Sequence, residues 1–213
     1  MSETPEIAGS RGWDGACERI ASWGKLKDKI SGKEYFALNT HLDHIGVVAR
    51  REGVSLILDR VNELSDGLPV IVTGDFNAEP ESDVIKHMTD AENPKHLQDT
   101  RLMSPIVYGP SWSFHDFGKI PYDKRPLIDY VFVRNDLKVL RYGVLAETEG
   151  SEFLSDHAPV LVNCRVVFYF LNFRLKIINL RFRRFIFRFR TEYLVLCTMN
   201  NKINFVNVTD KTR

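Results

Sequence analysis

Residues 68–73 form a short, unbroken apolar run, Leu-Pro-Val-Ile-Val-Thr, which constrains the fold more than any other segment. Such a run is typical of a β-strand that is buried on both faces. Residues 45–64 place their apolar side chains on one face at helical spacing, and residues 80–88 suit a short helix with Pro80 in its first turn. Because a strand buried on both faces needs a layer on each side, the sequence predicts an α/β fold built in layers around a sheet.

Strand-like patterns on both sides of this run supply the rest of the predicted sheet. Two of them are separated by Ser31-Gly32, which is typical of a hairpin turn, whereas residues 91–126 are rich in loop-forming residues. The strand-like segments comprise residues 19–29, 33–42, 127–133, 139–145 and 158–167.

The bulk composition suits one domain. The chain has 213 residues, of which 44% are hydrophobic and 27% charged, so it is long enough for a packed core. Its cysteines, Cys17, Cys164 and Cys197, form neither a disulfide framework nor a zinc-binding pattern. The first residues contain no leader-like apolar segment, and no stretch reaches the roughly 18 apolar residues of a membrane span. As written, the sequence predicts a cytoplasmic protein, or a secreted one if the true N-terminus is missing.

Basic charge is concentrated at the C-terminal end. Residues 168–213 hold ten of the 29 Lys and Arg residues, two of the 28 Asp and Glu residues and eight of the 14 Phe residues. Their net charge is therefore +8, whereas residues 1–167, with 19 basic and 26 acidic groups, carry −7. We expect a domain over residues 1–167, followed by a basic, Phe/Arg-rich tail over residues 168–213 that is not part of it.

Three interpretations of this tail are open. A cationic and aromatic segment suits binding to a membrane surface or to nucleic acid. It also suits an edge strand, because Phe185, Phe187 and Phe189 share one strand face. The third interpretation, translated sequence that never belonged to the domain, is favoured by the abrupt change in composition.

Polar side chains gather at the ends of the predicted strands. Because antiparallel neighbours bring the end of one strand beside the start of the next, we expect these clusters to meet at one edge of the sheet. The four clusters are Asn39-Thr40-His41-Leu42-Asp43-His44, Thr73-Gly74-Asp75-Phe76-Asn77-Ala78, Ile128-Asp129-Tyr130 and Ser155-Asp156-His157-Ala158-Pro159.

The chemistry of these clusters favours hydrolysis of a phosphate ester. They supply carboxylates, imidazoles and a carboxamide, but no Ser or Cys nucleophile beside a base. Carboxylates and water are the ligands that Mg²⁺ and Mn²⁺ prefer. Imidazole can exchange protons with a phosphoryl oxygen or a water, and a carboxamide can donate a hydrogen bond to a phosphoryl oxygen. The set therefore suits attack of water on phosphorus, assisted by a divalent metal.

Gly74-Asp75-Phe76-Asn77, followed in order by Ile128-Asp129-Tyr130 and Ser155-Asp156-His157-Ala158-Pro159, resembles the motif series of the endonuclease/exonuclease/phosphatase superfamily. The resemblance covers residues 1–167 and is greatest to a bacterial branch with poorly defined substrates. It implies an α/β fold, namely an incomplete four-layer sandwich of the DNase-I-like type with mixed, mostly antiparallel sheets flanked by helices. It also implies hydrolysis of phosphodiester or phosphomonoester bonds that depends on Mg²⁺ or Mn²⁺.

The resemblance implies roles for five catalytic residues. Asp75 would orient or deprotonate the attacking water, and Asn77 would hold that water or the phosphate. His157 would donate to a phosphoryl oxygen, with Asp129 orienting its ring and raising its pKa. His41 would contact the scissile phosphate.

Three further residues receive roles by the same resemblance. Asp156 would be a metal ligand. Arg19 and His44 are weaker candidates for contact with the substrate phosphate.

The sequence departs from the family pattern in two ways. It lacks a Gln-Glu pair, whose Glu is the family's main metal ligand, and it ends in an unrelated tail. We therefore expect a domain that lacks its N-terminal portion. A catalytically inactive fragment or binding module, and a polyanion- or membrane-binding protein acting through the tail, stay open as alternatives. The substrate also stays open among nucleic acid, a phospholipid head group and a small phosphodiester, as does the oligomeric state.

Plainer interpretations exist for several of these residues. Asp75 and Asn77 by themselves suit an ordinary turn, and His157 by itself suits a buried core histidine. The segment Ser113-Phe114-His115-Asp116 suits the lining of a substrate groove, but a plain loop with His115 near the surface is the favoured interpretation. The tryptophans are interpreted as core or loop-packing residues, with base stacking as an alternative for Trp112.

Overall fold

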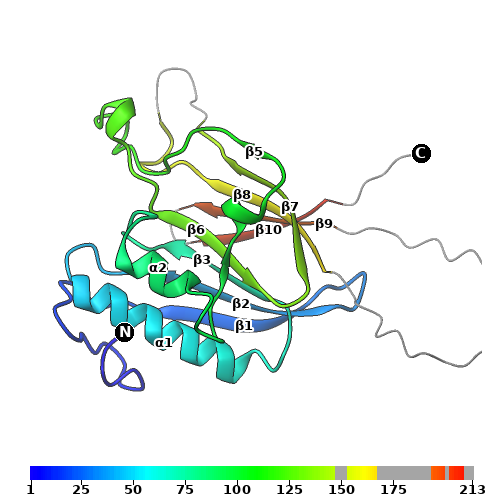
Figure 1. The fold of residues 1–213 in the computed structure, drawn as a ribbon, viewed down its shortest axis with the longest axis horizontal. Helices are drawn as coiled ribbons and strands as arrows, with labels where there is room; N and C mark the ends of the chain where they lie inside the picture. Colours follow the sequence, from blue (N-terminus) through cyan, green and yellow to red (C-terminus); the bar gives the residue numbers. More distant parts are fainter. Residues whose placement is uncertain (147–152, 167–192, 200–201, 209–213) are drawn as a thin grey trace, which may run out of the picture.

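The computed structural model describes residues 1–146 and 153–166, together with the backbone of residues 193–199 and 202–208. Its strands form two five-stranded sheets (Figure 1). The first sheet has the order β1 (Ala21–Lys27), β2 (Glu34–His41), β3 (Val70–Asp75), β6 (Asp129–Arg134), β4 (Gln98–Asp99). The second has the order β10 (Lys202–Val208), β9 (Tyr193–Met199), β8 (Val160–Val166), β7 (Leu137–Val144), β5 (Val107–Tyr108). The helices are α1 (Val47–Leu64), α2 (Asp83–Thr89), α3 (Thr100–Met103) and the 3₁₀ turn η1 (Tyr122–Lys124).

The expected hairpin and crossover build the first sheet. Strands β1 and β2 pair antiparallel around a turn in which Gly32 has a φ of 71° and its N–H bonds the Asp28 carbonyl. Strand β2 then pairs parallel with β3, and α1 makes the connection that such a pair needs. Every residue of β3 is buried, as its apolar sequence predicts. The expected hairpin, helix and central strand are therefore confirmed.

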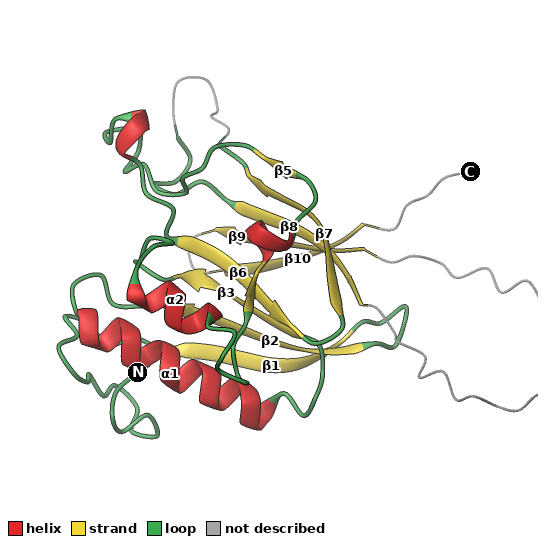
Figure 2. Ribbon diagram, in the orientation of Figure 1, coloured by secondary structure: helices red, strands yellow, loops and turns green. Residues whose placement is uncertain are grey.

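Alternating side chains divide the core into two layers. On one face of the first sheet, residues such as Phe36 and Val72 pack against α1 and α2. On the other face, Ile71 and Val131 pack against Tyr142 and other residues of the second sheet. Figure 2 shows α1 and α2 on the side of the first sheet that faces away from β7 and β8. The molecule is thus a mixed α/β structure, with its site-bearing strands between a helical layer and a second sheet.

The loop-rich stretch contains more structure than its sequence indicates. Strands β4 and β5, helix α3 and the turn η1 all fall between residues 91 and 126. The short helix α2 begins at Asp83, directly after the N-cap residue Ser82, whose hydroxyl accepts from the Ile85 N–H, and Pro80 lies before it. The expectation of Pro80 in the first turn was wrong, because a side-chain cap two residues later sets the start. His115, expected near the surface, is 2% exposed.

Part of the sequence-predicted tail lies in the second sheet. Strand β9 pairs antiparallel with β8 and with β10. Residues 168–192, including the Phe residues expected on one strand face, lie outside the described residues. The proposed boundary at residue 167 stays a prediction. In the part of the chain that can be described, no helix is long and apolar enough to cross a membrane.

Candidate active site

Three neighbouring strands bring their polar residues into one row. In the sheet register His41 lies beside Asp75, and Asp75 lies beside Asp129. Strands β2 and β3 end here and β6 begins here, so the parallel and antiparallel pairings meet at the same sheet edge. Because alternate residues share a face, Asp75 and Asp129 lie on the face of Ile71 and Val131, which is turned toward the second sheet. The expected convergence of these clusters is confirmed.

His157 completes the group from the second sheet. It precedes β8, and its Nδ1 lies 2.7 Å from Asp129 Oδ2. Its Nε2 lies 3.9 Å from Asp75 Oδ2, and the Nε2 of His41 lies 3.3 Å from the same oxygen. One potential ligand atom from each of Asp75, Asp129 and His157 lies within 4.8 Å of the others.

Burial gives Asp75 an unusual pKa. Loss of solvent, together with the negative charge of Asp129, raises the pKa of Asp75 to about 7, against the opposing N–H bond from Asn77. A carboxyl with such a pKa is half ionised near neutral pH, which suits a general base.

The pKa values of His41 and His157 are shifted in opposite directions. Burial and the positive charge of Arg19 lower the pKa of His41 to about 4, so its contact with Asp75 near neutral pH involves a neutral ring rather than an ion pair. Burial also disfavours the charged form of His157, but the hydrogen bond and negative charge of Asp129 outweigh it and raise the pKa of His157. The geometry thus separates a neutral imidazole from one that holds a proton more firmly.

Asn77 stands at the turn that leaves β3. Its φ is 45°, a left-handed conformation that Asn tolerates better than most residues. Its N–H donates to Asp75 Oδ1 at 2.8 Å, and its Nδ2 donates to the Leu42 carbonyl at 3.0 Å. The side chain therefore ties the end of β3 to the segment after β2, beside the group of Asp75.

Asp156 does not join the compact group formed by Asp75, Asp129 and His157. One of its carboxylate oxygens accepts from the Ser155 hydroxyl at 3.3 Å, and its carbonyl accepts from the N–H groups of His115 and Asp116. Its role as a metal ligand stays a prediction from the resemblance.

Arg19 and His44 lie together at the rim beside His41. Arg19 Nη2 lies 3.2 Å from His44 Nδ1, and Arg19 also borders a polar cavity of about 230 Å³ that reaches His41. Ser22 and Asn39 line the same cavity from β1 and β2. These positions keep both residues available for the phosphate contact that the sequence suggests.

A second group of potential ligands, Cys17, Asp43 and His44, lies at this rim. Its carboxylate is already engaged, because the Asp43 oxygens accept from the N–H groups of Ala16, Cys17, Ile45 and Gly46 at 2.7–2.9 Å. These donors hold the pKa of Asp43 well below its usual range despite burial. Together with the nearby Arg19 guanidinium, they favour a structural role over a cation site. Sequence reasoning missed this role, although Asp43 stands inside the first polar cluster.

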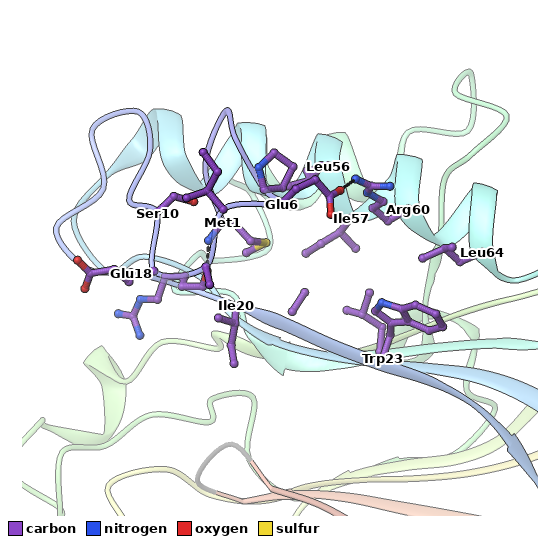
Figure 3. A pocket seen from close by; sticks show the side chains of 17 residues that line it. Met1, Glu6, Ser10, Glu18, Ile20, Trp23, Leu56, Ile57, Arg60 and Leu64 are labelled. Carbon is purple, nitrogen blue, oxygen red and sulfur yellow. Dashed lines mark hydrogen bonds and ion pairs between the residues drawn. The ribbon is translucent and has the colours of Figure 1, made fainter.

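A second cavity, with a volume of about 360 Å³, lies elsewhere. Figure 3 shows it between the N-terminal segment, α1 and β1. Ile20, Trp23 and Leu56 are among its lining residues, and Arg60 pairs with Glu6 at its side. The catalytic candidates Asp75, Asp129 and His157 are absent from its lining, although Arg19 borders both this cavity and the one that reaches His41.

The donor set at the sheet edge fits a hard divalent cation. Two carboxylates and one imidazole converge, and the two carboxylates repel each other, as the raised pKa of Asp75 reflects. A cation beside them would offset that repulsion. Among the described residues, one ligand atom each from Asp75, Asp129 and His157 could take part in such a site, although the 2.7 Å contact between His157 Nδ1 and Asp129 Oδ2 already engages one atom of each of those two residues.

Known proteins are similar to this chain in sequence and fold. A family model described as the endonuclease/exonuclease/phosphatase family matches residues 6–157. Among curated proteins no match was found. A Bacteroides vulgatus endonuclease/exonuclease/phosphatase is similar at 38% identity and a TM-score of 0.73, covering 78% of this chain and 62% of that one. A family protein from Bacteroides thetaiotaomicron is similar at 35% identity, with a TM-score of 0.69 and coverage of 76% and 60%.

A third similar structure, a mannosyl-6-phosphatase from Bacteroides thetaiotaomicron, has 34% identity and a TM-score of 0.69, and covers 76% of this chain and 62% of that one. This chain thus spans about three fifths of the length of these relatives. The match of the family model to most of the chain, at the residues that form the site, identifies it: the chain belongs to the endonuclease/exonuclease/phosphatase family.

Proposed function

We propose that this protein is a Mg²⁺- or Mn²⁺-dependent hydrolase of phosphate esters, acting by attack of water on phosphorus. The observation that carries the proposal is the convergence of Asp75 and Asp129, from neighbouring strands of the first sheet, with His157, from the segment that precedes β8. The frame would be an incomplete four-layer sandwich, of which the described residues supply one helical layer and two sheets. When bound, the metal supplies positive charge that activates water and offsets the charge of the phosphoryl oxygens.

The proposed acid and base differ in their surroundings. Asp75, with a pKa of about 7, accepts the proton of the attacking water. His157, whose pKa Asp129 raises, donates to a phosphoryl oxygen. His41, neutral beside Asp75, contacts the scissile phosphate, and Asn77 holds the water or the phosphate.

The rim residues are proposed to contact the rest of the substrate. Arg19 offers a fixed positive charge beside the cavity at His41, and His44 lies against it. Asp156 is proposed as a metal ligand, through its carboxylate. The neighbouring cavity, about 230 Å³ with Ser22 and Asn39 in its wall, suits a small polar group.

A small phosphate ester is the favoured substrate class. The relative described as a mannosyl-6-phosphatase acts on a sugar phosphate by its name, and its similarity supports testing sugar phosphomonoesters first. The net charge of −7 over residues 1–167 disfavours tight binding of duplex nucleic acid.

An inactive fragment is the second candidate. It is favoured by the position of Asp156 outside the compact group of Asp75, Asp129 and His157. In that case the folded protein binds phosphate esters without turning them over.

The deciding experiment measures hydrolysis of p-nitrophenyl phosphate, bis-p-nitrophenyl phosphate and mannose 6-phosphate with Mg²⁺ or Mn²⁺. The proposal expects a rate that EDTA removes, that added metal restores and that Asp75→Ala abolishes. Asp99→Asn is the matched control, because Asp99 is also a buried carboxylate of the first sheet and Asn retains its cap on the Arg101 N–H. A rate equal in Asp75→Ala and wild type would exclude the assigned site, and a folded protein without any rate would favour the inactive fragment.

A further inference from the structure

Ser113 lies where the two halves of the candidate site join. Its side chain is fully buried, in the long connection between β5 and β6. Its hydroxyl oxygen accepts from two consecutive backbone N–H groups, those of Ile128 at 3.0 Å and Asp129 at 3.1 Å. A hydroxyl oxygen has two lone pairs and can accept both hydrogen bonds, whereas a methyl group can accept neither. The hydroxyl therefore holds the backbone at the first residue of β6.

The backbone of Ser113 also bonds the segment that leads into β8 of the second sheet. The Ser113 carbonyl accepts from the Ala158 N–H at 2.6 Å, directly after His157. The next residue, Phe114, forms a β-bridge with His157, and their ring centroids lie 4.8 Å apart. One buried residue thus connects the strand that carries Asp129 with the segment that carries His157.

We propose that Ser113 is a positioning residue, which sets the hydrogen bond between Asp129 and His157 by holding their two backbone segments together. The inference rests on the proposed function only for its effect on turnover. The physical reason is that Asp129 begins β6 of the first sheet, whereas His157 lies in the segment that leads into β8 of the second sheet. Their 2.7 Å contact therefore depends on how closely these two segments approach. Groups behind a catalytic pair that fix its orientation are often as important as the pair itself.

Ser113→Ala is the test variant, because it removes the acceptor for two buried N–H groups and keeps the carbonyl contact to Ala158. Turnover is expected to fall about 10- to 100-fold with KM nearly unchanged. Substrate contacts at Arg19 and His41 remain, so the loss belongs in kcat.

Thr100→Val is the matched control. Thr100 is also fully buried, and its hydroxyl donates to the Val131 carbonyl of the same strand at 2.7 Å. The control removes one buried hydroxyl bond to β6 without touching the join to His157. It is expected to lower the unfolding temperature while kcat of the folded protein stays within about twofold, since it touches no group at the reacting atoms.

A double-mutant cycle separates positioning from general destabilisation. If Ser113 acts through the Asp129–His157 pair, Ser113→Ala reduces kcat far less in an Asp129→Asn background than in wild type. Independent, multiplicative losses in the two variants would overturn the proposal.

A spectroscopic signal decides the matter even if no substrate is turned over. The proton on His157 Nδ1 that bonds Asp129 gives a low-field proton resonance, assigned by its disappearance in Asp129→Asn. It should persist in Thr100→Val and broaden or vanish in Ser113→Ala. An unchanged resonance in folded Ser113→Ala overturns the role of Ser113, whereas absence of turnover in wild type contradicts only the proposed function.

Discussion

The Nδ1 atom of His157 lies 2.7 Å from Asp129 Oδ2, although Asp129 begins β6 of the first sheet and His157 lies in the segment that leads into β8 of the second sheet. Such a bond fixes the tautomer and the direction of the imidazole, leaving Nε2 on the side of Asp75. It also explains the raised pKa of His157, which burial alone would lower. The site is therefore a product of the packing between the sheets.

Replacing Asp129 by Asn should reduce turnover by roughly 100-fold or more, because the ring of His157 loses both its orientation and the charge that stabilises its proton. The measurement is kcat on whichever of the three proposed phosphate esters is hydrolysed, with circular dichroism to verify folding. Asp99→Asn serves as the control with an unchanged rate. Equal rates in Asp129→Asn and wild type would contradict the assigned pair.

Replacing Asp75 by Asn should stabilise the metal-free protein at high pH while abolishing turnover. Burial raises the pKa of Asp75 from 3.8 to about 7, so the folded state binds a proton more tightly than the unfolded state. Stability of the wild type therefore falls as pH rises from about 4 to about 7, and Asp75→Asn lacks this loss. Thermal unfolding in EDTA across that range should show a gap that widens to the order of 2–4 kcal/mol. A difference in stability between the two proteins that did not change with pH would contradict the burial of the Asp75 charge.

Asp43→Asn should destabilise the fold by about 2–4 kcal/mol, because an amide cannot accept the four backbone N–H bonds that the carboxylate accepts. The pKa of Asp43 is lower in the folded state than its value of 3.8 in the unfolded state. The ionised carboxylate therefore stabilises the fold when the pH is above 3.8, and this stabilisation is lost as the pH falls below that value. Urea unfolding of both proteins should show a difference at pH 7 that shrinks below pH 4. A constant difference would mean that charge is not involved.

Gly74→Ala should cost about 1–3 kcal/mol through overpacking, since a Cβ at this position would overlap the Thr40 carbonyl of the neighbouring strand. The shift would also separate His41 from Asp75, so turnover should fall with stability. Gly53→Ala is the control, because its added methyl meets Leu42 and Met1 at ordinary contact distance inside α1. That control should be neutral or slightly stabilising by thermal unfolding, as Ala favours helix. Equal stability of the two variants would argue against the close approach of β2 and β3.

Local pattern was sufficient for the regular elements near the site. The apolar run of β3 and the helical spacing of α1 each depend on residues close in sequence, and both match the structure. The gathering of His41, Asp75 and Asp129 also followed, because strand ends must meet at one edge once the strands pair. The short elements between residues 91 and 126 did not follow, because their pairing with β6 and β7 depends on distant partners.

The sequence by itself determined which chemistry is available, since the order of the Asp, Asn and His motifs is a property of the chain. Only the tertiary structure decided how that chemistry is arranged. The burial of His115, the position of Asp156 outside the compact group and the join made by Ser113 all depend on how two sheets pack. No local pattern encodes such contacts, because their free energy comes from residues that are far apart in sequence and meet only in the folded core.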